Sequence, residues 1–267
     1  MTVVGFLYGV SPSRQSVVHG VRRLLEKAGA RVVEARATGD APPRELLAAD
    51  VVALRALDER TLPTAEALAA AGVRCVNTPA ATAAARDKVT AQRGLEAGGV
   101  AAPAARVELE WAAARAAALA SPTVVKAARG SRGRGVLTPG AELPEEPPFA
   151  PPYLLQEAVA GDGLDRKLYV VGDEVRGVAR RWPAVTLADK TGRPFVPSDE
   201  LRELALAAAR ALGLDLCGVD VVVAPDRAVV VDVNAFPGYK GVADAAELLA
   251  RHLLAPAGRT EEVACAR

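Results

Sequence analysis

Two apolar segments in the last quarter of the chain carry oxygen-bearing side chains that are typical ligands of Mg²⁺. Asp220 lies within Gly-Val-Asp-Val-Val-Val, and Asp232 and Asn234 lie within Val-Val-Val-Asp-Val-Asn. Asp232 and Asn234 are two residues apart, so on a strand their side chains point to the same face. Mg²⁺ binds such groups together with phosphate oxygens. Because three polar groups within apolar runs are costly to bury alone, the pattern favours a metal site over a solvated hairpin.

A second segment has the composition of a phosphate-binding loop. The apolar segment Thr123–Lys126 ends on a lysine, and Arg129–Gly135 follows with alternating arginines and glycines. Glycine lets backbone N–H groups approach phosphate oxygens, and the basic side chains neutralise their charge. The loop lacks the Gly-Lys-Ser/Thr order of a Walker A motif. A solvated basic turn has a similar composition, so this loop alone leaves both interpretations open.

A third segment, Tyr153–Glu157, is extended and apolar and ends in Gln-Glu. The backbone N–H and C=O groups that follow such a strand are suited to the edge of an adenine ring. Asp165 and Lys167 come shortly afterwards as candidate nucleotide contacts, although an isolated aspartate at this place is more often a turn residue.

Composition and charge argue against several classes of protein. The chain has 33 basic and 32 acidic residues and a net charge of +1, which gives no indication of a nucleic-acid or membrane partner. No apolar run reaches the length of a membrane helix, and a cytoplasmic protein is expected. Three widely spaced cysteines disfavour a zinc site. Only His19 and His252 are available as the base of a nucleophilic triad, which makes that chemistry improbable.

The amino-terminal part alternates between strands and helices, which predicts a small parallel sheet covered by helices. The strands are expected at Val3–Tyr8, Arg31–Glu34, Val51–Leu54 and Arg74–Val76, and the helices at Ser13–Ala28, Arg44–Ala48 and Leu62–Ala71. The Gly9–Ser13 segment follows the first strand, where open α/β sheets often bind ligands, although any loop between a strand and a helix has this appearance.

The rest of the chain mixes helices with further strands. Helices are expected at Ala80–Ala97, Trp111–Ala120, Ser198–Leu212 and Val242–Leu254, and strands at Thr123–Lys126, Tyr153–Gln156, Leu168–Val171, Val175–Arg181, Val219–Val223 and Ala228–Val233. Gly172-Asp173 is a turn signal, so the strands on either side of it are expected to form a hairpin.

The order of these motifs resembles the ATP-grasp superfamily. It runs through Arg86-Asp87-Lys88, Lys126 with its glycine loop, Gln156-Glu157, Asp165, Asp220 and Asp232-Val233-Asn234. The likeness is greatest to the glutamate-ligase branch typified by the ribosomal protein S6 modification enzyme, and it spans the chain from about Thr78 to Leu254. Its most specific stretch is Asp232–Gly241, in which the asparagine is followed by Pro-Gly.

The resemblance implies an α/β amino-terminal domain followed by an ATP-grasp fold, in which two α+β lobes clasp ATP. The corresponding divisions are residues 1–78, 79–152 and 153–267. By position, the implied nucleotide contacts are Lys88, Lys126, Gly133, Gln156, Glu157, Ala158, Val159, Asp165 and Lys167, and the implied Mg²⁺ ligands are Asp220, Asp232 and Asn234. Within these sets the first two lysines would hold phosphates, residues 157–159 would contact adenine, and Asp165 would lie on the ribose side.

The family's usual reaction phosphorylates a carboxylate and then joins it to an amine. The function implied is therefore that of an ATP-dependent, Mg²⁺-requiring carboxylate–amine ligase acting on small molecules, and homodimers are common among such proteins. Arginine is suited to bidentate contact with carboxylate and phosphoryl groups. The candidates for this role are Arg132, Arg134, Arg180 and Arg181, each of which has surface solvation as its competing interpretation.

Two departures keep an alternative open. Position 232 is Asp where the ligase branch commonly has Glu, and the Arg180–Thr186 segment differs from the Arg/Asn/Gly-rich segment of that branch. Both features look more like the inositol polyphosphate kinase branch, whose members would phosphorylate a hydroxyl of a cyclitol or sugar phosphate. The glycine loop lacks the histidines of that branch. A nucleotide-sensing module without catalysis is a third hypothesis, disfavoured because all expected metal ligands and both lysines are present.

Overall fold

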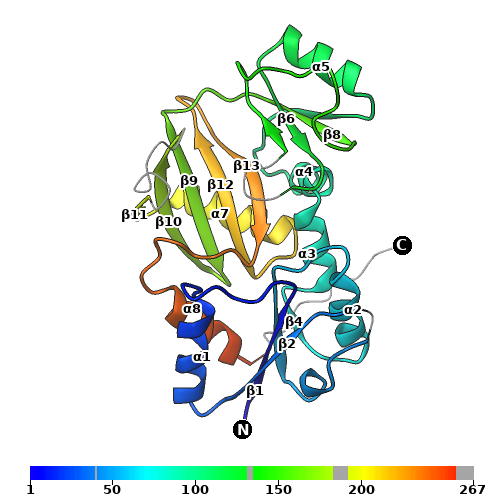
Figure 1. Cartoon of the computed structure of the whole chain (residues 1–267). Coiled ribbons are helices and arrows are strands. Elements are labelled where there is room, and N and C mark those ends of the chain that lie inside the picture. Colours follow the sequence, from blue (N-terminus) through cyan, green and yellow to red (C-terminus); the bar gives the residue numbers. More distant parts are fainter. Residues whose placement is uncertain (40, 131–134, 183–191, 257–267) are drawn as a thin grey trace, which may run out of the picture.

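The computed structural model describes residues 1–39, 41–130, 135–182 and 192–256. It contains three sheets arranged one after another along the molecule, with helices packed between and beside them (Figure 1). Arg132, Gly133 and Arg134 lie outside the described residues, so their predicted roles stay predictions. Among the described helices, none is both long and apolar enough to cross a membrane.

The amino-terminal sheet is parallel and has the order β2-β1-β3-β4, as the strand–helix alternation predicts. Its strands are β1 (Val3–Tyr8), β2 (Arg31–Arg36), β3 (Val51–Arg55) and β4 (Cys75–Val76), and its helices are α1 (Val18–Lys27), the 3₁₀ helix η1 (Arg44–Leu46) and α2 (Leu62–Ala70). Because the strands are parallel, the loops that follow β1 and β3 lie at the same edge of the sheet.

The segment between the first and second sheets corrects the prediction of one continuous helix. It forms α3 (Pro79–Arg86) and α4 (Lys88–Ala97), separated by Asp87 in an extended conformation. The Asp87 carboxylate accepts a hydrogen bond from the Thr90 N–H at 3.0 Å, which is the N-cap arrangement for α4. The Lys88 N–H donates to the Ala128 carbonyl at 2.8 Å. This break therefore fixes Lys88 at the start of a helix and against the following lobe.

The central lobe is an antiparallel sheet of order β5-β8-β6-β7 with one covering helix. Its elements are β5 (Ala105–Glu108), α5 (Trp111–Ala120), β6 (Thr123–Ala127), β7 (Val136–Leu137) and β8 (Tyr153–Glu157). A small core forms where Trp111 contacts Tyr153 and Phe149 at ring-centroid separations of 5.4 and 6.4 Å. This lobe places the end of β6, with Lys126, toward the carboxyl-terminal sheet.

The carboxyl-terminal lobe contains an antiparallel sheet of order β11-β10-β9-β12-β13. Its elements are β9 (Leu164–Val171), β10 (Glu174–Arg181), β11 (Arg193–Phe195), α7 (Asp199–Ala211), β12 (Leu216–Val223), β13 (Ala228–Ala235) and α8 (Ala245–Leu254). The predicted hairpin of β9 and β10 is present, with Gly172 at φ 58° in its turn. β9 begins four residues earlier than predicted, so Asp165 belongs to a strand and not to a turn.

The two faces of this sheet have different partners. Leu168, Val219 and Val233 point to the face that packs against α7 and α3. Tyr169 and Leu216 point to the other face and share a core with Phe6 of β1 and with α8. In Figure 1, α8 accordingly lies beside α1 of the amino-terminal domain. The amino-terminal domain and the carboxyl-terminal lobe are therefore packed through one hydrophobic core, whereas the central lobe has a core of its own.

Candidate active site

The three predicted metal ligands lie together on one face of the carboxyl-terminal sheet. β12 and β13 pair with Asp220 directly opposite Asp232, and a β-bulge follows Asp220. The Asn234 amide nitrogen lies 3.2 Å from an oxygen of Asp232 and 3.4 Å from an oxygen of Asp220. Bulges are common beside active sites because they re-aim a side chain. Two adjacent strands thus deliver two carboxylates and one amide to a single point.

Three lysines from three different elements surround these carboxylates. Lys88, at the start of α4, contacts Asp232 at 3.0 Å, and Lys167 of β9 contacts Asp220 at 2.5 Å. Lys126, at the end of β6, donates to the Val231 carbonyl at 2.7 Å. These contacts join the central lobe and α4 to the carboxyl-terminal sheet, so the cluster lies where the two lobes meet.

The electrostatics of the cluster are set by burial and mutual charge. Burial acts to raise the pKa of Asp232, but Lys88 and Lys126 outweigh it and hold that pKa below its ordinary value. Burial lowers the pKa of Lys126. Burial also acts against the charge of Lys167, yet the neighbouring Asp220 carboxylate raises the pKa of that lysine. The cluster is therefore a charged, partly dehydrated site, in which electrostatic interactions are stronger than in water.

Asp165 lies beside this cluster, two residues before Lys167 on the same face of β9. Burial and the Asp220 carboxylate raise the pKa of Asp165 to about 6. Arg180 lies directly opposite Asp165 on β10, and its positive charge acts to lower the pKa of Asp165. The position predicted for a ribose contact is thus part of the carboxylate and lysine cluster.

The two predicted arginines of β10 occupy different environments. Arg180 donates to the Tyr169 hydroxyl at 2.8 Å, and its buried Nε has no hydrogen-bond partner in the described part of the chain. Arg181 is the next residue along the strand, so it points to the opposite face, and it is exposed. The structure therefore brings Arg180, and not Arg181, to the face that carries the cluster.

Sequence reasoning missed Tyr169 as a member of this site. Its hydroxyl accepts from Arg180, lies 3.2 Å from the Lys240 carbonyl and positions the arginine above the sheet. The signal was the alternation Asp165, Lys167, Tyr169, which places three polar side chains on one face of a strand.

The predicted adenine segment is held by hydrogen bonds to its own lobe and to α4. The Gln156 side chain is buried and donates to the Gln92 side chain of α4 at 2.7 Å. The N–H groups of Glu157 and Ala158 donate to the carbonyls of Ala104 and Pro122. Gln156 therefore holds the end of β8 in position, and its side-chain amide is already hydrogen-bonded to Gln92.

The donor set at the cluster fits Mg²⁺. No group of three or more His, Cys, Asp or Glu side chains with metal-binding geometry occurs among the described residues. Mg²⁺ does not require one, because it is bound by one or two carboxylates and completes its octahedron with phosphate oxygens and water. Asp220 and Asp232 supply the carboxylates, and a half-turn of the Asn234 amide exchanges its nitrogen for an oxygen at the same place.

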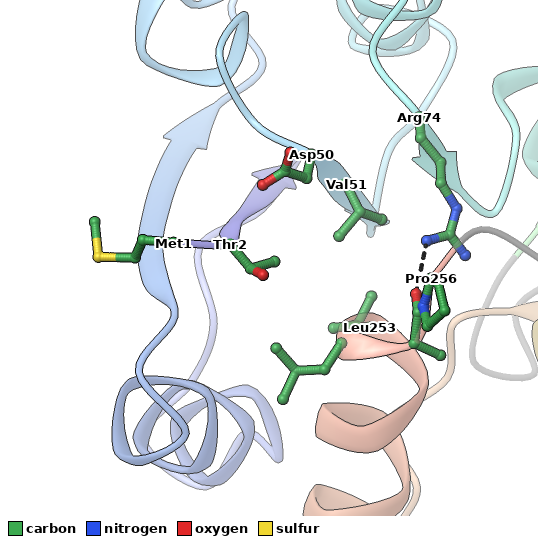
Figure 2. A pocket seen from close by; sticks show the side chains of 9 residues that line it. Met1, Thr2, Asp50, Val51, Arg74, Leu253 and Pro256 are labelled. Carbon is green, nitrogen blue, oxygen red and sulfur yellow. Dashed lines mark hydrogen bonds between the residues drawn. The ribbon is translucent and has the colours of Figure 1, made fainter.

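A separate pocket lies at the other end of the amino-terminal sheet (Figure 2). It is lined by Thr2 and Asp50, which precede β1 and β3, and by the end of α8, where Arg74 donates to the Ala255 carbonyl at 3.4 Å. Asp50 already accepts from the Val3 N–H at 2.7 Å. This pocket lies at the amino ends of the strands and contains none of the cluster residues.

Comparisons with known proteins agree with the fold. A family model described as the RimK-like ATP-grasp domain matches residues 85–255. A probable alpha-L-glutamate ligase of Mannheimia succiniciproducens is 31% identical over 188 residues, which cover 65% of this chain and 63% of that protein. The chain thus matches somewhat less than two thirds of that relative's length.

Solved structures extend the likeness of fold to almost the whole chain. The RimK-domain ATP-grasp protein of Sphaerobacter thermophilus superposes with a TM-score of 0.72 at 20% identity, covering 95% of this chain and all of that one. The ATP-grasp ligase PsnB, complexed with a minimal precursor, Mg and ADP, gives a TM-score of 0.70 at 19% identity, covering 94% and 96%. The predicted ATP-grasp fold is confirmed, and the chain belongs to the RimK-like ATP-grasp family.

Proposed function

We propose that the chain is an ATP-dependent, Mg²⁺-requiring ligase that joins a carboxylate to an amine through an acyl phosphate. The observation that carries this proposal is the partly buried cluster of Lys88, Lys126 and Lys167 around Asp220 and Asp232 where two lobes meet. Such a cluster is suited to a polyphosphate and its cation, because it offers positive charge for phosphate oxygens and carboxylates for a metal.

The nucleotide is proposed to lie between the central lobe and the carboxyl-terminal sheet. Lys88 and Lys126 would contact the phosphates, and the end of β8 with the two residues after it, from Glu157 to Val159, would meet the adenine. The Glu157 carboxylate is paired with Arg227 of the carboxyl-terminal lobe at 3.4 Å, which brings both walls of this region together. Asp220, Asp232 and Asn234 would hold Mg²⁺, which when bound neutralises charge on the phosphoryl group being transferred.

The acid substrate is proposed to bind at Arg180. This arginine has a buried Nε without a partner in the described residues and lies beside Lys167 and Asp165. A carboxylate held there would attack the terminal phosphorus of ATP, and ADP would leave. The amine would then attack the carbonyl carbon of the acyl phosphate, lose a proton and displace phosphate. The protein contributes charge and orientation, and no protein nucleophile is required.

The names of the relatives favour a ligase over the kinase alternative. The Mannheimia relative is a probable alpha-L-glutamate ligase, and PsnB is a ligase crystallised with a precursor. We therefore propose glutamate, as a free amino acid, as the first amine to test, and a small carboxylate as the acid. A cytoplasmic enzyme with small-molecule substrates remains part of this proposal.

The deciding experiment measures ADP release from Mg-ATP across a panel of acids, with hydroxylamine added to trap acyl phosphates. A ligase gives a hydroxamate with one acid, and its ADP release in the absence of hydroxylamine depends on both an acid and an amine. ADP release only with cyclitol or sugar phosphates, without hydroxamate, would establish a kinase. ATP binding without turnover across the panel would leave a nucleotide-sensing module.

A further inference from the structure

The described residues include three non-glycine residues with left-handed backbone angles, and all three lie at one junction. Ala56 (φ 53°) follows β3, and Phe236 (φ 36°) and Tyr239 (φ 50°) follow β13. Each such conformation is strained and is retained where the surroundings impose it, often at ligand sites. The junction joins the carboxyl edge of the amino-terminal sheet to the loop that leaves the metal-binding strand.

Hydrogen bonds and close packing hold both sides of this junction. The Gly9 N–H donates to the Arg55 carbonyl at 3.1 Å, and a Cβ at Gly9 would lie 2.2 Å from the Ala56 carbonyl oxygen, so only glycine fits. On the other side, the Phe236 N–H donates to the Leu216 carbonyl at 2.8 Å, and the Tyr239 hydroxyl donates to the Val170 carbonyl. The strained loops are therefore fixed in place and form a preorganised surface.

Arg55 lies at the centre of this junction. Its guanidinium carbon is 5.4 Å from the centroid of the Phe236 ring, and its Nη1 donates to the Ser16 hydroxyl at 2.9 Å. Burial lowers the pKa of Arg55. No carboxylate of the described residues lies within ion-pair distance of it. The guanidinium is half-buried, makes one side-chain hydrogen bond and lies over an aromatic ring. It therefore retains unused N–H donors, which favour binding of an anion.

Aromatic side chains connect Arg55 to the residues proposed for the chemistry. Phe236 is two residues beyond Asn234, or about 7 Å along an extended chain. Tyr239 contacts Tyr169 with ring centroids 5.2 Å apart, and Tyr169 in turn holds Arg180. Arg55 and Arg180 thus lie at opposite ends of an aromatic group. The same aromatic side chains connect Arg55 to the arginine that is proposed to hold the acid substrate.

We propose that Arg55, with the Ser16 hydroxyl, binds the non-reacting carboxylate of the amine substrate, which is therefore an amino acid and not a simple amine. This inference rests on the proposed ligase function and assigns the second substrate to the junction between the amino-terminal domain and the 236–240 loop. With its carboxylate at Arg55, the amino group is directed toward the acyl phosphate beside Arg180. Arg55 selects the substrate and does not take part in phosphoryl transfer.

The test removes the charge from each partner in turn. Turnover is measured with L-glutamate, or with whichever amino acid is most active in the panel above, and with the same amino acid as its α-carboxamide. Arg55→Met is compared with the wild type and with Arg36→Met, an exposed arginine at the end of β2, two strands away in the same sheet. Stabilisation of each variant by Mg-ATP in a melting experiment establishes that it is folded and binds nucleotide.

The wild type and Arg36→Met should prefer the acid over the amide by about 10- to 100-fold in kcat/KM, the range expected for one hydrogen-bonded charge. In Arg55→Met this preference should fall to within a few-fold of unity. An undiminished preference in a folded, nucleotide-binding Arg55→Met would overturn the assignment while leaving the ligase intact. If the wild type forms neither hydroxamate nor amide, the proposed function fails and the assignment of Arg55 fails with it.

Discussion

At the scale of single residues, the proposed chemistry of this chain depends on charges that are partly buried together. Asp220 and Asp232 were separable from ordinary acidic residues in the sequence because each interrupts an apolar run. The contact between Lys88 and Asp232 joins residues 144 positions apart, and no local pattern encodes it. Arg55 ends an ordinary apolar strand, so its lack of a carboxylate partner is visible only once the strand is packed.

Replacing Asp220 with Asn should lower ATP turnover by about 100-fold or more, because it removes a proposed Mg²⁺ ligand and the partner of Lys167. The measurement is the rate of ADP formation at saturating Mg-ATP. The matched control is Asp226→Asn, an exposed aspartate in the turn of the same hairpin, which should retain full activity. Unchanged turnover in Asp220→Asn would remove this residue from the metal site.

Asp165 should make stability depend on pH in a predictable direction. Its pKa is raised from 3.8 to about 6 in the folded protein, so folding is favoured when it is protonated and this stability is lost as pH rises through 6. Asp165→Asn should therefore raise the melting temperature of the nucleotide-free protein by a few degrees near pH 7.5 and by much less near pH 4.5. Measurements are made in the presence of a chelator. An equal change in melting temperature at both pH values would show that ionisation of the Asp165 carboxyl does not destabilise the folded protein.

At the scale of elements, the pattern of apolar residues predicted most helices and strands, but it missed the short strands β5, β7 and β11. Other differences lie where polar contacts intervene. The continuous helix predicted across Asp87 is interrupted because that side chain caps α4 and its neighbour pairs with the central lobe. β9 extends back to Leu164 because it pairs with β10 along its whole length. The preferences of single residues do not predict the stability that this pairing adds. Tertiary contacts set these boundaries.

Gln156 should stabilise the joint between β8 and α4. It is buried, and its amide donates to Gln92, which also donates to Glu96 and to the Pro103 carbonyl. Gln156→Ala leaves a buried acceptor without its donor and should lower the free energy of unfolding by about 1–3 kcal/mol. Denaturant titration measures this loss.

The control for Gln156 is Gln15→Ala, at an exposed position in the loop after β1, which should change stability by less than about 0.5 kcal/mol. A Gln156→Ala protein as stable as this control would show that the buried pair contributes nothing to the joint.

At the scale of the whole molecule, the predicted order of an α/β domain followed by an ATP-grasp fold is present, but the packing between the parts is not visible in the sequence. Phe6 of β1 shares a core with Tyr169 and Leu216 of the last lobe. The apolar residues on each of these strands predict burial without specifying the partner. The divisions at residues 78 and 152 therefore remain predictions about folding units.

Asn77 should couple the stability of the amino-terminal domain to that of the last lobe. Its buried side chain donates to the Leu216 carbonyl at 2.9 Å and accepts from the N–H groups of Asp215 and Leu216, each at 2.8 Å. Asn77→Ala should lower the free energy of unfolding by about 2–4 kcal/mol, because three hydrogen bonds of a buried side chain are lost. Calorimetry should show both parts still melting together at a lower temperature.

The control is Arg74→Ala, which removes one long, exposed hydrogen bond on the same side of the molecule and should alter the melting temperature little. Two separated transitions in the Asn77→Ala protein, one for each part, would show that the shared core does not make them a single cooperative unit.

The shared core also restricts how such a chain can diverge over evolutionary time. Recombination that replaced the first domain with an unrelated one would expose Tyr169, Leu216 and Leu249 to water. Exchange of that whole domain should therefore leave an exposed apolar surface that promotes aggregation. Ser16 lies in the loop after β1 and Arg55 is the last residue of β3, and neither belongs to this core. We therefore expect new preferences for the proposed second substrate to arise by changes in the loop after β1 and around the end of β3, while the strands that are proposed to hold the nucleotide stay under constraint.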